Sequence, residues 1–117
     1  MTEVTIFHNP ACSKSRAALA AIRAAGREPR VVEYLKTPPS RAEVQALLAA
    51  AGLAPRQAMR TKDELYKSLG LGDAALSDDQ LLDAIARHPA LLERPFVVTP
   101  RGTRLCRPAE RLDEIFP

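Results

Sequence analysis

Cys12 is the residue of this 117-residue chain whose surroundings most favour chemistry. It lies in a polar turn between a short β-rich segment and an Ala-rich segment of helical periodicity. A cysteine reacts as its thiolate, and the N–H groups and positive dipole end of a helix start stabilise that anion. Lys14 and Arg16 add nearby positive charge. Ser13 and Ser15 offer hydrogen-bond donors. We therefore predict a nucleophilic Cys12, because so polar a turn is a poor place to bury a structural cysteine, which is the alternative.

The residues around Cys12 do not include a second thiol. A Cys-x-x-Cys motif would need a cysteine at position 15, where Ser15 stands. A disulfide formed on Cys12 must then be resolved by Cys106 or by an external thiol such as glutathione. Cys106 falls in a predicted strand, where a small apolar residue is usually part of the core, so we favour the external thiol. His8 either tunes the Cys12 thiol or closes the preceding strand through a turn hydrogen bond.

The charge of the chain is carried mostly by arginine, with 13 Arg against 4 Lys and a formal net charge of +3. Arginine binds oxyanions in bidentate fashion, so this excess indicates either an anion site or a coding bias without functional meaning. The basic residues alternate with acidic ones and form no stripe, which argues against a nucleic-acid partner. Two cysteines are too few for a disulfide scaffold or a four-cysteine zinc site, and we expect no metal site.

The overall composition is typical of one soluble domain. The apolar fraction is 46% and the charged fraction 26%, which suits a compact globular protein. No apolar run is long enough to cross a bilayer, so we expect no membrane partner. Two cysteines predicted to stay free favour a reducing compartment, and we expect a cytoplasmic protein.

The elements that must position Cys12 can be read along the chain. The opening third predicts a strand at Val4 to Phe7, a helix at Ser15 to Ala25 ended by Gly26, and a strand at Arg30 to Leu35. Capping pairs in the middle predict three helices, starting near Ser40 with Glu43, Thr61 with Glu64, and Ser77 with Gln80. The last third predicts a strand at Phe96 to Val98, a turn at Thr99 to Thr103, a return strand at Arg104 to Cys106, and a helix at Ala109 to Ile115 opened by Pro108.

This order of elements predicts an α/β fold of thioredoxin-like type. A β-α-β unit comes first, a helical insertion at about 40–90 follows, and a β-β-α unit closes the chain. Short, right-handed connections favour a single mixed sheet, and we expect residues 1–117 to form one domain. The pattern by itself leaves another α/β sandwich possible.

Several ordered motifs resemble the arsenate reductase family of the glutaredoxin-coupled type, over essentially the whole chain. They are Ile6-Phe7-His8-Asn9-Pro10-Ala11-Cys12 with Ser15-Arg16, Tyr34-Leu35-Lys36-Thr37-Pro38-Pro39, Arg60 with Leu65-Tyr66 and Leu69-Gly70-Leu71, Arg94-Pro95-Phe96-Val97-Val98-Thr99-Pro100, and Gly102-Thr103-Arg104-Leu105-Cys106-Arg107-Pro108.

The resemblance implies a catalytic mechanism and the residues that carry it. Cys12 attacks arsenate, while Arg60, Arg94 and Arg107 hold the oxyanion. Glutathione, as co-substrate, takes over the arsenic adduct, and glutaredoxin reduces the resulting mixed disulfide, so no bound cofactor is expected. His8 and Ser15 would support the site, together with a cis peptide bond before Pro95. Guanidinium groups suit this task, since a thiolate approaches a multiply charged anion only where charge is compensated.

The chain departs from the family pattern in two places. After Cys12 the family usually carries Gly-Thr, whereas this chain has Ser13-Lys14, and its end lacks the family's longer tail. These differences suggest a shorter subgroup with weak arsenate activity or another natural substrate.

Two alternative functions remain. They are a glutathione-dependent thiol reductase with another substrate and a non-catalytic, Spx-like regulator that binds RNA polymerase. The Spx redox switch is usually a Cys-x-x-Cys, which Ser15 rules out here.

Overall fold

The computed structural model describes residues 3–107 and 109–115. The chain divides into two compact units. The first, here called the sheet unit, spans Met1–Thr37 and Arg94–Pro117, and the second, the helical unit, spans Pro38–Glu93. The prediction of one domain over residues 1–117 stays a prediction. Within the described residues, no helix is both long and apolar enough to cross a membrane.

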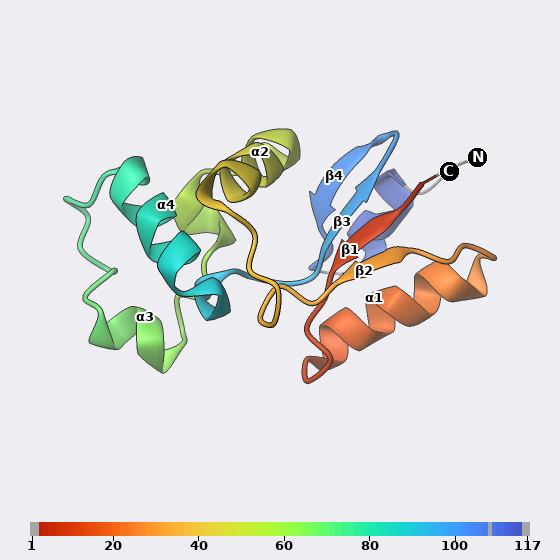
Figure 1. The fold of residues 1–117 in the computed structure, drawn as a ribbon, viewed down its shortest axis with the longest axis horizontal. Coiled ribbons are helices and arrows are strands. Elements are labelled where there is room, and N and C mark those ends of the chain that lie inside the picture. The colour runs from red at the N-terminus through yellow and green to blue at the C-terminus, as the bar shows by residue number, and fades with distance from the viewer. Residues whose placement is uncertain (1–2, 108, 116–117) are drawn as a thin grey trace. The chain divides into compact units, whose positions relative to one another are not determined.

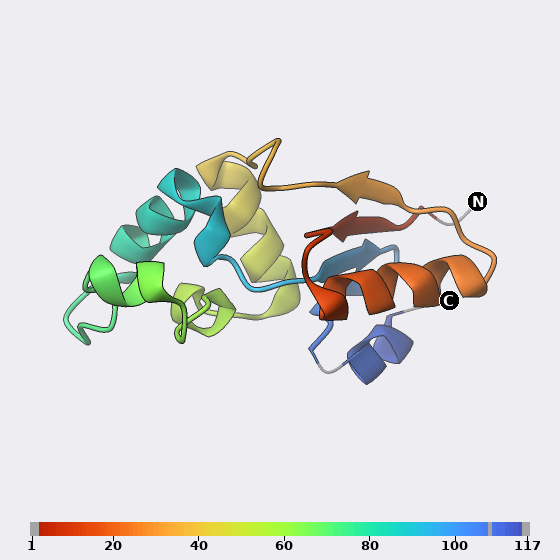
Figure 2. The ribbon, with the colours of Figure 1, turned by 90° about the horizontal axis from the view of Figure 1, so that it is seen from below.

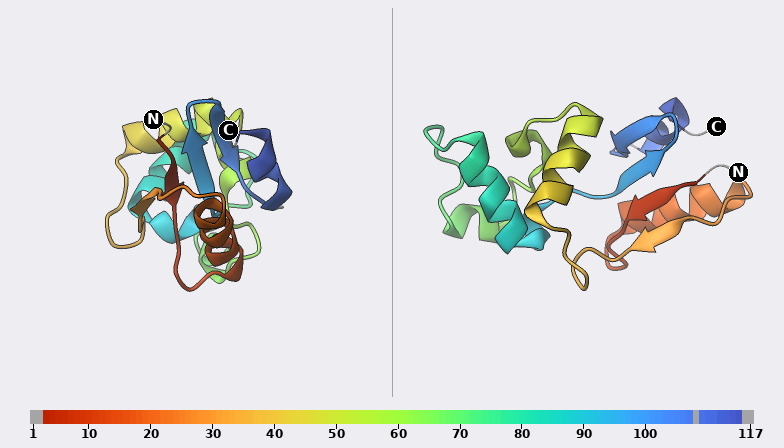
Figure 3. Two further views of the ribbon diagram at one scale, coloured as in Figure 1. Left: turned by 90° about the vertical axis from the view of Figure 1, so that its right-hand side faces the viewer. Right: turned by 45° about the horizontal axis from the view of Figure 1, so that its top comes forward.

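The sheet unit is built on four strands in the order β2-β1-β3-β4 (Figure 1). Its elements are β1 (Thr5–Phe7), α1 (Ser13–Ala24), β2 (Arg30–Val32), β3 (Phe96–Thr99), β4 (Gly102–Leu105) and the 3₁₀ helix η3 (Ala109–Glu114). β1 runs parallel to β2 and antiparallel to β3, and β3 and β4 form an antiparallel hairpin that is clearest in the right-hand view of Figure 3. This is the predicted mixed sheet with β-α-β and β-β-α units.

α1 and η3 pack against each other on one side of this sheet (Figure 2). Alternating strand residues such as Ile6 and Val97 point to that side, because successive strand side chains face opposite ways. They meet Ala18 and Ile22 of α1 and Leu112 of η3 in a closed aliphatic core. This packing determines where the N-terminus of α1, and therefore Cys12, lies relative to the strand ends.

The helical unit contains the predicted insertion. Its elements are α2 (Arg41–Ala51), η1 (Pro55–Ala58), α3 (Glu64–Ser68), α4 (Asp78–Arg87) and η2 (Pro89–Leu91). Ser40 and Ser77 form the predicted capping boxes with Glu43 and Gln80. The buried apolar faces of α2 and α4, including Val44 and Leu81, pack against each other.

Several predicted boundaries are shifted by one to three residues, and hydrogen bonds in a turn and at a helix cap account for two of the shifts. The second strand stops at Val32 instead of continuing to residue 35, since the Glu33 carbonyl accepts the N–H groups of Lys36 and Thr37, both at 2.9 Å, in a turn.

Two more of the shifted boundaries are a helix start and a strand end. α3 is capped by Asp63 and not by Thr61, because Asp63 Oδ1 accepts the Leu65 N–H at 2.9 Å. β4 ends at Leu105, one residue before Cys106, although the Cys106 N–H still donates to the Pro95 carbonyl at 2.9 Å and so continues the pairing with β3. The closing helix is a 3₁₀ helix, and the predicted role of Pro108 lies outside the described residues.

Candidate functional site

Cys12 is the N-cap residue of α1, as predicted from its place in the sequence. Its backbone is extended, with φ −96° and ψ 122°, and its carbonyl accepts the Arg16 N–H at 3.0 Å to begin the helix. The Cys12 residue is only 9% exposed, so the expectation that a polar turn would leave it open was wrong. This burial is compatible with a reactive thiol, because the surrounding groups lower its pKa.

The electrostatic surroundings of Cys12 favour its thiolate. Burial by itself would raise the pKa of this thiol, but the backbone N–H of Ser15, the Arg94 guanidinium and the backbone N–H of Lys14 outweigh it, so the pKa lies below its usual value. The cation responsible is therefore Arg94, and not Lys14 or Arg16 as the sequence suggested. The Arg16 guanidinium donates instead to the Pro10 carbonyl at 2.8 Å.

The β3–β4 hairpin brings two of the predicted arginines to this sulfur. Phe96 pairs with Leu105, so the residues just before β3 and just after β4 lie side by side. Arg107 Nη1 is 4.0 Å from Cys12 Sγ and donates to the Arg94 carbonyl at 3.1 Å. Cys12, Arg94 and Arg107 thus form one cationic thiol site within the sheet unit.

The peptide bond between Arg94 and Pro95 is cis, as the family resemblance implied. Pro95 is almost fully buried, and its carbonyl accepts the N–H of Cys106 at 2.9 Å. This bond extends the pairing of the two hairpin strands to the residues next to both arginines.

His8 and Ser15 form a buried pair directly behind Cys12. Their Nδ1 and Oγ atoms are 2.6 Å apart, and the residues are 6% and 0% exposed. Burial lowers the pKa of His8, Arg23 and Arg16 lower it further, and Glu33 opposes them. The tautomer of the imidazole sets whether Nδ1 or the Ser15 hydroxyl donates in this hydrogen bond. In either case, the hydroxyl predicted to donate to the thiol is paired with His8.

Two roles were considered for His8, closing the preceding strand and tuning the Cys12 thiol. The His8 backbone N–H donates to the Val32 carbonyl at 2.8 Å, which continues the pairing of β1 with β2 in place of the predicted turn hydrogen bond. Tuning of the Cys12 thiol by the imidazole stays a prediction.

Cys106 belongs to the core of the sheet unit. It is 1% exposed, and burial raises the pKa of its thiol to about 11. Its Sγ lies 3.8 Å from the Arg104 carbonyl. A protonated, enclosed thiol is a poor nucleophile, so the geometry favours the structural over the resolving interpretation.

Arg60 lies in the helical unit. Its backbone N–H donates to the Leu91 carbonyl at 2.8 Å, and its guanidinium forms an ion pair with Asp63 at 3.4 Å. Its predicted role in oxyanion binding stays a prediction.

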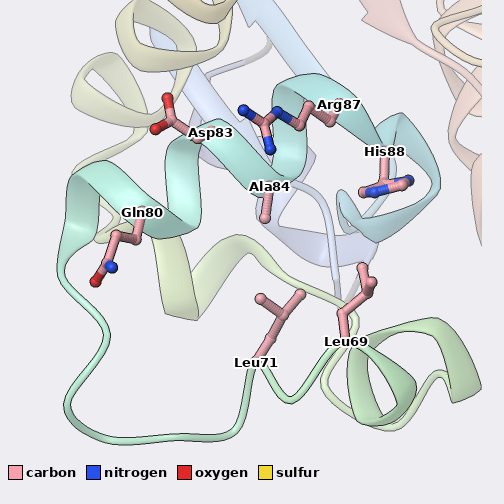
Figure 4. Close-up of a pocket in the computed structure, with 7 residues that line it drawn as sticks. All are labelled: Leu69, Leu71, Gln80, Asp83, Ala84, Arg87 and His88. Carbon is pink, nitrogen blue, oxygen red and sulfur yellow. The ribbon is translucent and has the colours of Figure 1, made fainter.

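The helical unit also has an open pocket of about 300 Å³, shown in Figure 4. It is lined by Leu69, Leu71, Gln80, Asp83, Ala84, Arg87 and His88. None of these residues was predicted to take part in chemistry, and the thiol site does not involve them.

Asn9 is the residue of the site that sequence reasoning missed. The sequence assigned it no role beyond its place in the family motif, yet it makes hydrogen bonds to Ala11, Cys12 and Ser15. The available signal was its position two residues before Ala11 and next to Pro10, since an asparagine side chain often bonds to the backbone two residues later.

Known proteins resemble the chain over its whole length. The model of the ArsC family matches residues 7–115. The arsenate reductase of Rhizobium meliloti is 62% identical over 114 residues, which cover 97% of this chain and 81% of the relative. The arsenate reductase of Escherichia coli strain K12 is 49% identical over 117 residues, covering 100% and 83%.

A solved structure extends the likeness to three dimensions. The arsenate reductase from Vibrio cholerae superposes with a TM-score of 0.95 at 49% identity, over 98% of each chain. This agreement confirms the thioredoxin-like fold predicted from the order of the elements.

Proposed function

The chain belongs to the ArsC family, and we propose that it is an arsenate reductase that takes its electrons from glutathione and glutaredoxin. The observation that carries the proposal is the thiol site, where Arg107 Nη1 lies 4.0 Å from Cys12 Sγ and Arg94 lowers the pKa of that thiol. The relatives that are 49–62% identical are named arsenate reductases, which supports the choice of substrate.

The first step is attack of the Cys12 thiolate on arsenic. A sulfur–arsenic bond forms, and one arsenate oxygen leaves as water after it takes up protons. Arg94 and Arg107 offset the repulsion between the thiolate and the oxyanion, and they stabilise the charge that shifts to oxygen as the bond forms. Both guanidinium groups stay charged throughout, because arginine does not lose its proton in proteins.

The second step transfers two electrons from sulfur to arsenic. A glutathione thiolate forms a disulfide with Cys12, the sulfur–arsenic bond breaks, and As(V) leaves as As(III) in arsenite. Overall, arsenate and two thiols become arsenite, one disulfide and one water. Glutaredoxin then returns Cys12 to its thiol, since the buried Cys106 is a poor resolving group.

Two further parts of the proposal rest on the sequence match alone. Arg60 occupies the third arginine position of the family pattern, and we include it in oxyanion binding. Dependence on glutathione places the protein in a reducing compartment, which we take to be the cytoplasm. The reaction requires no bound metal or prosthetic group, because thiols supply the electrons.

The test is arsenate-dependent NADPH oxidation with glutathione, glutaredoxin and glutathione reductase supplied. We expect turnover with the wild-type chain and none with Cys12→Ser. Arg94→Ala and Arg107→Ala should each lower kcat/KM for arsenate roughly 10-fold or more, as loss of a charged hydrogen bond does. Arg101→Ala, an exposed arginine in the turn of the same hairpin, is the matched control and should behave like wild type.

Two results would overturn the proposal. One is wild-type turnover no faster than the mixture without the protein. The other is equal turnover in wild type and Cys12→Ser. Replacing glutathione and glutaredoxin by thioredoxin and its reductase tests the electron source separately, and undiminished turnover with thioredoxin would contradict the glutaredoxin coupling.

A further inference from the structure

Asn9 makes three hydrogen bonds that connect the loop before α1 to the helix itself. Its side-chain Oδ1 accepts the Ala11 N–H at 3.0 Å, an arrangement that turns the chain through Pro10. Its carbonyl accepts the Cys12 N–H at 3.0 Å. Its own N–H donates to Ser15 Oγ at 3.0 Å. Side chain, carbonyl and amide of one residue thus bind three points around the cysteine.

The start of α1 differs from the starts of the other three α-helices in the described part of the chain. Ser40, Asp63 and Ser77 each cap their helix with a side-chain oxygen that accepts a backbone N–H. Cys12 makes no such cap hydrogen bond. The N–H groups of Ser15 and Lys14 lower the pKa of the Cys12 thiol, but Cys12 provides no cap hydrogen bond of the kind that the side-chain oxygens make at the other three helices.

The loop before α1 also contacts the helix start, and Asn9 makes three of the hydrogen bonds between them. We propose that Asn9 is a positioning residue, which acts through the Ala11 and Cys12 backbone to hold Cys12 Sγ against the first turn of α1. This proposal deepens the proposed function and rests on it for the catalytic use of Cys12.

The positioning effect of Asn9 on Cys12 can be tested without changing the charged groups around the sulfur. Arg94 and Arg107 face Cys12 from the ends of the β3–β4 hairpin. His8 at the end of β1 is buried, and its lowered pKa keeps it neutral near pH 7. Asn9 carries no charge, so a neutral substitution there leaves all of these groups as they were and changes only the geometry of the loop.

The experiment measures the thiol pKa of Cys12 from the pH dependence of alkylation by iodoacetamide, with the labelled peptide identified by mass spectrometry. Asn9→Ala removes the side-chain acceptor and should raise this pKa by about 0.5–1 unit, the effect expected from losing one hydrogen bond of ordinary strength. Asn9→Leu removes the acceptor while keeping a side chain with the same number of heavy atoms branched at Cγ, and it should give the same shift. Asn9→Ser keeps an acceptor and should return at least half of it.

The matched control is Asp73→Ala in the helical unit. Asp73 Oδ1 accepts the Ala75 N–H at 2.9 Å, so the variant loses a turn bond of the same kind far along the chain. Its Cys12 pKa should equal that of wild type. In the arsenate assay, Asn9→Ala should lower kcat and leave KM for arsenate nearly unchanged, because both hairpin arginines remain.

Two outcomes would overturn the assignment of Asn9. One is a Cys12 pKa in Asn9→Ala and Asn9→Leu equal to that of wild type. The other is Asn9→Ser shifted as far as Asn9→Ala. Neither pKa measurement needs arsenate, so this inference can fail independently of the proposed function. Failure of the proposed function would appear as a wild-type protein that does not turn over arsenate although its Cys12 pKa is lowered and responds to the Asn9 substitutions as expected.

Discussion

Substitution of Ser15 by alanine tests whether the buried pair behind the cysteine stabilises the fold. The Ser15 hydroxyl lies 2.6 Å from His8 Nδ1 and accepts the Asn9 N–H at 3.0 Å. Ser15 is 0% exposed and His8 is 6% exposed, so water cannot easily replace the lost group. Alanine would therefore leave the buried His8 Nδ1 and the partly buried Asn9 N–H without their present partner.

The expected cost follows from these two groups. A buried polar group without a partner costs about 1–3 kcal/mol, and the partly buried Asn9 N–H belongs at the lower end. We expect Ser15→Ala to lower the free energy of unfolding by about 2–4 kcal/mol, a large part of a stability of about 5–15 kcal/mol. For a chain of this length, the melting temperature should fall by roughly 8 °C or more.

The assay is urea unfolding followed by far-ultraviolet circular dichroism, with thermal melts alongside. Ser13→Ala is the control, because Ser13 is an exposed residue in the same helical turn and should change stability by less than about 0.5 kcal/mol. Combining Ser15→Ala with His8→Phe should cost less than the sum of the two single changes, since the pair is broken once. A Ser15→Ala protein as stable as Ser13→Ala would refute the reasoning.

Two further predictions concern the other thiol and the end of the chain. In the folded protein at neutral pH, iodoacetamide should label Cys12 but not Cys106, because the pKa of Cys12 is lowered while burial raises that of Cys106 to about 11. Equal labelling of both thiols before denaturant is added would contradict this. Thr99→Val should lower the free energy of unfolding by about 1–3 kcal/mol, since the buried hydroxyl donates to the Ile115 carbonyl at 2.6 Å. A melt no lower than that of exposed Thr61→Val would show that this bond does not stabilise the fold.

Local features of the fold could be predicted from sequence because they depend on neighbouring residues. The capping boxes at Ser40 and Ser77 involve residues three apart, so their partners are visible in the sequence. Gly26 ends α1 with φ 82°, a conformation that glycine adopts without steric cost. Cys12 at the start of a helix was predictable for the same reason, since strand, turn and helix follow one another directly.

The cap of α3 shows where local reasoning fails. Thr61 and Asp63 both precede Glu64 at plausible spacing, and sequence reasoning favoured the pair that matched a capping box. The backbone after Arg60 instead turns so that Asp63 reaches the Leu65 N–H. The choice between two nearby caps therefore depends on the path of the entering chain, which the residues themselves do not specify.

For the chemistry of the site, too, neighbouring residues predicted one part and the tertiary structure decided the other. That Cys12 should be a thiolate nucleophile followed from its own sequence neighbourhood, and the family pattern named Arg94 and Arg107 beside it. Only the tertiary structure showed that Arg94, more than 80 residues away, is the cation that lowers the Cys12 pKa, while the nearer Arg16 binds the Pro10 carbonyl. Electrostatic interactions act over distances in space, and the pairing of β3 with β4 sets those distances here.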